Sequence, residues 1–109
     1  MTQEKVFAMP FAKIYDCYVQ KAIRKQRTQQ EVDTILRWIT GYEELPMDVT
    51  LSSFFTDAPH LNPKLEEVTG TICGIRVELV EDPIMRLIRR TDKLIDELAK
   101  GKSMEKILR

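Results

Sequence analysis

The sequence predicts a mainly α-helical protein, folded as one small domain over residues 1–109 with about four helices. Two observations carry this prediction. Apolar residues recur at helical spacing in several segments, and residues that favour helix ends stand beside those segments. With 43% hydrophobic residues and no repeat of solenoid length, the chain can bury one modest core. A short strand near residues 71–80 stays open, so the alternative is an α+β fold with a two-stranded sheet.

The first predicted helix begins at Phe11. Apolar side chains follow it at the i, i+3, i+4, i+7 spacing of one helix face as far as Ile23. Pro10 suits the first turn, where a missing N–H costs least. The segment ends at residue 27 in the basic run KAIRKQR, which is favourable at the negative end of the helix dipole.

The second predicted helix begins at Thr28. The sequence TQQE forms a capping box, in which Glu31 reaches back to the cap residue. A buried stripe runs from Val32 to Ile39, and Gly41 is placed to end the helix in the left-handed conformation. These two helices form a hairpin or corner.

Residues 42–63 contain three prolines, which break regular structure. At most one short helix fits between them, at about residues 50–57, with Thr50 or Ser52 as its N-cap. Phe54 and Phe55 are too apolar for a free linker, and we expect them to cover the core or a partner surface.

Residues 71–80, TICGIRVELV, carry two patterns. Apolar side chains alternate with others from Cys73 onward, which is typical of a strand. A strand needs a partner, and the only other candidate, residues 5–9, is short and adjoins Pro10. Ile72, Arg76 and Leu79 also stand at nearly helical spacing. One or two helical turns are therefore the interpretation that we favour.

The longest predicted helix begins with Asp82 as its N-cap and Pro83 at its first position. Apolar residues form a stripe along it, and Gly101 ends it. Residues 103–109 add one more turn. A helix this short is unstable alone, so it must dock on the protein's own core or on a neighbour.

The net charge is zero, which lowers the expectation of a dedicated nucleic-acid binder. The charges are unevenly distributed, however. Residues 1–27 carry six basic and two acidic side chains, residues 28–85 carry three and eleven, and residues 86–109 carry eight and four. We expect the two basic ends to fold back on the acidic middle.

Metal and cofactor sites are not expected. The chain has one histidine and no cysteine or acidic motif with metal-ligand spacing, and its four glycines never form a phosphate-binding loop. It also has no long apolar run and no signal peptide at its start, so we expect a cytoplasmic protein with free thiols and no membrane span.

Nucleophilic chemistry would need a thiol near a base or a cation, because the thiolate is the reactive form. Cys73 stands three residues before Arg76, and His60 is the candidate base. The walls of such a pocket would be aromatic: Trp38, Tyr42, Phe54 and Phe55. We favour the simpler interpretation that Cys73 is a buried packing residue.

A cationic ridge is the most distinct functional candidate. Four side chains fall within about a third of the circumference of the longest helix, opposite its apolar stripe: Arg86, Arg89, Arg90 and Lys93. Arginines this early in a helix oppose its dipole, so the pattern needs a partner outside the helix. We expect the protein's own acidic middle, and the alternative is an anion such as nucleic acid or a phosphorylated ligand.

The segments FAKIYDCYVQKAIRKQRTQQEVDTILRWITGY, FFTDAPHLNP and GTICGIRVELVEDPIMRLIRRTDKLIDELAKGKSMEKILR together resemble a bacterial family of this length, the domain of unknown function 2200. The pieces RVE, EDPIM, DKLIDELAKGK and KILR carry the resemblance most specifically. It implies a single-domain bacterial protein and brings no activity, cofactor, partner or site residue.

We therefore expect a small bacterial binding or interaction module without catalytic activity, which self-associates as a homodimer. Its motivation is the absence of a catalytic constellation, together with strong amphipathic helices and aromatics that look exposed in the sequence. The first alternative is nucleic-acid or phosphate-ligand binding through the cationic ridge. The second is a small enzyme that uses Cys73 or His60.

Overall fold

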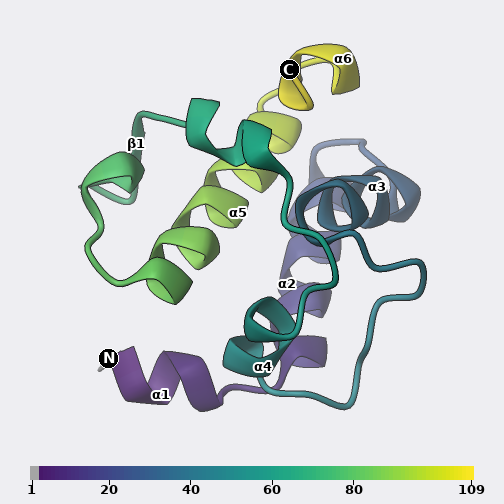
Figure 1. The fold of residues 1–109 in the computed structure, drawn as a ribbon. Helices are drawn as coiled ribbons and strands as arrows, with labels where there is room; N and C mark the ends of the chain where they lie inside the picture. Colours follow the sequence, from purple (N-terminus) through teal and green to yellow (C-terminus); the bar gives the residue numbers. More distant parts are fainter. Residues whose placement is uncertain (1–2) are drawn as a thin grey trace.

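The computed structural model describes residues 3–109 and confirms a mainly α-helical fold with a small two-stranded sheet (Figure 1). The elements in chain order are α1 (Gln3–Ala8), α2 (Phe11–Arg24), α3 (Gln29–Thr40), α4 (Leu51–Thr56), the 3-10 helix η1 (Pro63–Glu67), β1 (Thr71–Ile72), β2 (Ile75–Arg76), the 3-10 helix η2 (Val77–Leu79), α5 (Pro83–Ala99) and α6 (Met104–Ile107).

The core is built around α5. This helix contacts α2, α3, α4 and α6, and also β1 and η2. In Figure 1 it runs through the middle of the molecule, with the hairpin on one side and α2 and α3 on the other. Its stripe of Ile88, Leu94, Ile95 and Leu98 is at most 4% exposed. Because such side chains gain most of their stabilisation from complete burial, α5 fixes the positions of its neighbours.

The predicted ends of α3, α4 and α5 are confirmed. Thr28 and Glu31 form both bonds of the capping box, and Gly41 takes the left-handed conformation after α3. Thr50 caps α4, and Asp82 caps α5 with Pro83 in its first turn. These signals depend on residues within one helical turn, which is why the sequence shows them.

The end of α2 differs from the prediction. The helix ends at Arg24, three residues before the end of the basic run. Gln26 adopts φ 64°, and the N–H groups of Gln26 and Arg27 donate to the carbonyls of Ile23 and Ala22. This is a Schellman ending with a glutamine in the position that glycine favours.

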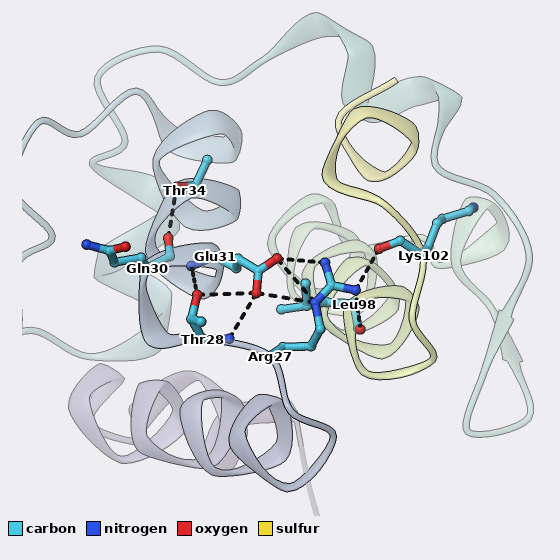
Figure 2. Close-up of polar contacts among 7 residues, drawn as sticks. All are labelled: Arg27, Thr28, Gln30, Glu31, Thr34, Leu98 and Lys102. Carbon is cyan, nitrogen blue, oxygen red and sulfur yellow. Dashed lines mark hydrogen bonds and ion pairs between the residues drawn. The ribbon is translucent and has the colours of Figure 1, made fainter.

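Arg27 uses that ending to join three segments (Figure 2). Its Nη2 lies 2.7 Å from Glu31 Oε2, and its Nη1 lies 2.8 Å from the carbonyl of Lys102 and 3.3 Å from that of Leu98. The hydrogen bonds from Arg27 lower the pKa of the Glu31 carboxyl. One guanidinium therefore connects the start of α3 to the carbonyl of Leu98 in the last turn of α5 and to the carbonyl of Lys102 just after that helix.

The N-terminal segment is helical, so the candidate strand at residues 5–9 was wrong. The chain pairs slightly later instead: the N–H of Phe11 donates to the carbonyl of Val49, and that of Leu51 donates to Met9. This pairing forms an isolated bridge between Pro10 and Thr50, which brings α1 against α4.

Residues 71–80 contain part of each predicted structure. β1 and β2 form a two-residue antiparallel hairpin, and η2 follows it directly. The strand finds its partner within the same segment, because the chain reverses at Cys73 and Gly74. Both turn residues have positive φ, 51° and 78°, as in the tight turns that suit a two-residue hairpin loop.

The C-terminal turn docks on the protein's own core. Ile107 of α6 is 0% exposed, and Arg109 and Lys102 both pair with the buried carboxylate of Glu97. The Nζ of Lys64 donates to the carbonyl of Arg109 at 2.9 Å. The apolar side of this turn is therefore already covered within the chain.

Replacing Arg27 with methionine tests the joint between the segments. Arg27→Met keeps an apolar stem and loses every bond to Glu31 and to the carbonyls of Leu98 and Lys102, so we expect the free energy of unfolding to fall by about 2 kcal/mol. Urea denaturation measures this loss. The exposed Arg24→Met, which breaks no described bond, should stay close to the wild type.

The same variant has a pH signature. Because the pKa of Glu31 is lowered in the folded chain, its ion pair stabilises the protein above the unfolded value of 4.5 and is lost as the pH falls through the folded value. Arg27→Met should lose stability less steeply on acidification below this value. An equal acid dependence in both proteins would contradict the assignment.

The hairpin turn gives a second prediction. A positive φ costs a cysteine about 1 kcal/mol, whereas asparagine tolerates it and is favoured before glycine in such turns. Cys73→Asn should therefore raise the urea midpoint without changing the slope of the transition. Cys17→Asn in the middle of α2 should have little effect, because the two residues have similar helix propensities. A lower midpoint for Cys73→Asn would contradict the turn geometry.

Candidate functional site

The cationic ridge of α5, defined as Arg86, Arg89, Arg90 and Lys93, lies against the segment that contains the hairpin. Nε of Arg86 donates to the carbonyl of Val80 at 2.7 Å, and Nε of Arg90 donates to Val68 at 3.2 Å. The Nζ of Lys93 donates to Thr71 at 3.2 Å. The partners are therefore main-chain carbonyls of residues 68–81, rather than the carboxylates that we expected from the acidic middle.

This arrangement explains why basic residues stand so early in α5. Residues 68–81 have little regular structure, and carbonyls without partners in a helix or sheet need other donors. Charged donors make stronger hydrogen bonds than neutral ones. Arg89 differs from the other three, because its Nη1 lies 3.4 Å from Asp92 on the same helix. Binding of an external anion by the ridge stays a prediction.

The structure brings together the aromatic residues of the predicted pocket. Phe54 is 0% exposed and its ring lies 5.2 Å from that of Tyr42 and 5.1 Å from that of Phe55. The hydroxyl of Tyr42 donates to the carbonyl of Phe54, and Trp38 packs partly buried against the same core. The expectation that Phe54 and Phe55 cover the core is therefore confirmed. The interpretation that the four aromatics look exposed was wrong, since Trp38 and Tyr42 are also partly buried.

Of the other three, Cys73 and Arg76 lie apart from the aromatics, whereas His60 lies against Gly41 at the end of α3. Cys73 and Arg76 belong to the hairpin, on the side of α5 away from α3 (Figure 1). Cys73 is exposed at the turn, so its interpretation as a buried packing residue was wrong. His60 is exposed, and its N–H donates to the carbonyl of Thr40 at the end of α3. Within residues 3–109, no hydrogen bond joins Cys73 to His60 or Arg76, and the guanidinium of Arg76 pairs with Glu78.

A buried tyrosine and a half-buried aspartate form an ionisable pair that joins α2 to α5, and no sequence pattern predicted it. The hydroxyl of Tyr18 donates to Asp92 Oδ1 at 2.6 Å. Burial raises the pKa of the Asp92 carboxyl, against the opposing effects of the Tyr18 hydroxyl and Arg89. Burial and the charge of Asp92 raise the pKa of Tyr18 well above 10.0. Both effects keep the phenol protonated at neutral pH, so the pair acts as a structural link.

The most exposed apolar side chain of the described residues was also missed. Leu79 is 71% exposed and Ile75 is 38% exposed, whereas Val77 between them is 0% exposed. Alternation along a strand would place all three on one face. The chain turns into η2 at Val77, and three residues per turn send positions two apart to different sides. No signal in the sequence distinguishes Leu79 from Val77.

Two absences bear on chemistry. In the part of the chain that the structure describes, no three histidine, cysteine or acidic side chains are grouped closely enough to hold a metal ion. None of the helices formed by residues 3–109 is both long and apolar enough to cross a membrane.

Comparison with known proteins places the chain among uncharacterised proteins. The profile of a family described as "Uncharacterized protein conserved in bacteria (DUF2200)" matches residues 5–109. The "Crystal structure of uncharacterized protein SP1917" is similar to the whole fold, with a TM-score of 0.91 and 41% sequence identity; the match covers 99% of this chain and 93% of that chain. A search of the curated proteins finds no match.

The pair of Tyr18 and Asp92 gives a prediction with a definite sign. A carboxyl with a raised pKa binds its proton more tightly in the folded chain, so its ionisation lowers stability as the pH rises from 3.8 through the folded value. Asp92→Asn removes this charge and keeps an oxygen acceptor for Tyr18. We expect its free energy of unfolding at neutral pH to rise by about 1 kcal/mol, measured by urea denaturation over a pH series.

The matching variant is Tyr18→Phe, which leaves the Asp92 carboxylate without its hydroxyl donor. It should lower the free energy of unfolding by about 1–3 kcal/mol at neutral pH, and by less when combined with Asp92→Asn. A loss of stability in Asp92→Asn alone would show that the charge of Asp92 is needed.

Proposed function

This chain belongs to the bacterial family DUF2200, and we propose that it is a binding module without catalytic activity that self-associates as a homodimer. The observation that carries the proposal is the exposed apolar surface of Ile75 and Leu79, named here the hairpin surface. Covering an exposed leucine with a partner removes apolar surface from water and lowers the free energy. Leu79, 71% exposed beside a well-packed core, therefore favours an interface.

A second copy of the chain suits the hairpin surface because the charges around it have both signs. The side chain of Arg76 is 65% exposed, and Glu81 is exposed and makes no ion pair among the described residues. In a two-fold dimer the same surface faces itself, so it needs opposite charges on one patch. Around this surface a cation and a carboxylate flank the apolar residues.

The two alternatives receive less support. Three of the four ridge cations already donate to carbonyls, which reduces the N–H groups available for nucleic acid. A cysteine enzyme needs an activating neighbour, and the described residues give Cys73 no hydrogen-bond partner. Self-association needs neither free cationic N–H groups nor an activated thiol, because it depends on apolar burial.

Sedimentation velocity over a concentration series tests the proposal. We expect the wild type to shift from monomer to dimer as concentration rises, and Leu79→Gln to weaken the dimer. Burying a leucine contributes about 1.5–3 kcal/mol, which corresponds to an increase in Kd of about tenfold to a hundredfold.

Ile23→Gln is the matched control. Ile23 is 52% exposed in the last turn of α2. On the same helix, Tyr18 and Lys21 contact the C-terminal half of α5, whereas η2 lies near the start of α5. This variant should dimerise like the wild type. A wild type that stays monomeric over the whole series would remove the dimer proposal, and equal effects of the two variants would remove the hairpin surface from it.

A further inference from the structure

A hollow of about 350 Å³ lies between η1 and α5. Four apolar residues line it, Leu61, Pro63, Leu65 and Leu87, together with Asn62, Glu66 and Arg90. Leu61 is 41% exposed at the hollow, whereas Leu65 is 4% exposed. Its size falls in the lower range of small-molecule sites, and its lining combines apolar side chains with polar ones.

Among residues 3–109, Arg90 is the only cation on the walls of this hollow. It is half-buried, and its Nε is held by the carbonyl of Val68. Neither Nη nitrogen has a hydrogen-bond or ion-pair partner among residues 3–109, and the charges of Glu66 and Glu78 act on the guanidinium only from a distance. Burial and the nearby charge of Arg86 lower the pKa of Arg90. A guanidinium still stays protonated at neutral pH, so it is a charged donor lacking a close counterion.

We propose that this hollow binds a small monocarboxylate carried on an apolar chain, with the carboxylate on the free Nη groups of Arg90 and the chain against Leu61 and Leu87. Two parallel N–H donors match the two oxygens of a carboxylate, and this pairing is strongest where water is partly excluded. The apolar walls select the chain. This inference is independent of the proposed dimer, because the hollow includes neither Ile75 nor Leu79.

Glu66 gives the proposal its sharpest consequence. Its carboxylate lines the same hollow and acts on Arg90 without pairing with it. A bound carboxylate would therefore be repelled by Glu66 while Arg90 attracts it. Glu66→Gln removes this repulsion, so the variant should bind the carboxylate more strongly.

Hexanoate is the probe, with hexan-1-ol and hexylamine as controls that have the same chain. Titrations of the full chain are followed by NMR of the backbone amides and the Arg90 Nε–H group. Hexanoate should shift the signals of Leu61, Leu87 and Arg90 and bind at least about tenfold more tightly than hexan-1-ol, because a charge-assisted pair contributes about 1.5–3 kcal/mol. Hexylamine should not bind.

Two variants that leave Arg90 in place complete the test. Glu66→Gln should tighten hexanoate binding by about threefold or more, and Leu61→Asp should weaken it by about tenfold or more. Equal binding of hexanoate and hexan-1-ol would overturn the proposal. Chemical-shift changes centred on Lys21 and Arg24, cations of α2 outside the hollow, would also overturn it. Unchanged affinity in Glu66→Gln would also overturn it.

Discussion

Burial of the apolar stripe of α5 is the constraint on which the rest of the structure depends. The helix contacts α2, α3, α4, α6, β1 and η2, so each part of the chain is positioned by the side of α5 that it covers. Such burial is non-directional and would by itself tolerate sliding. Directional links remove this freedom: Tyr18 of α2 donates to Asp92, and Arg27 donates to the carbonyls of Leu98 in α5 and Lys102 just after it.

Several cations of this protein donate hydrogen bonds to main-chain carbonyls. Arg86, Arg90 and Lys93 bond to the segment of residues 68–81, and Arg27 bonds to the end of α5. Both places leave carbonyls without regular partners, because one is irregular and the other is a helix end. Among the described residues, no buried side-chain polar atom lacks a partner. Charge in this chain is therefore used first for folding.

What remains for function is the surface that folding leaves uncovered. The hairpin surface lies on the segment that the ridge holds against α5, and the hollow lies between η1 and α5. Both combine apolar side chains with a few charges. This composition is typical of interfaces and ligand sites, as the two proposals require. A binding role is thus consistent with the membership of this chain in an uncharacterised bacterial family.

The sequence by itself determined the helices and most of their ends, because caps such as Thr28, Asp82 and Gly41 act on groups within one turn. It also placed the four ridge residues on one face, since they share one helix. It could not show that the ridge meets carbonyls or that Cys73 and Leu79 are exposed. Those outcomes depend on contacts between segments far apart in the chain. The local pattern of residues 71–80 suits either a strand or a turn. Packing against α5 selects which of its side chains are buried, so these outcomes follow from the tertiary structure alone.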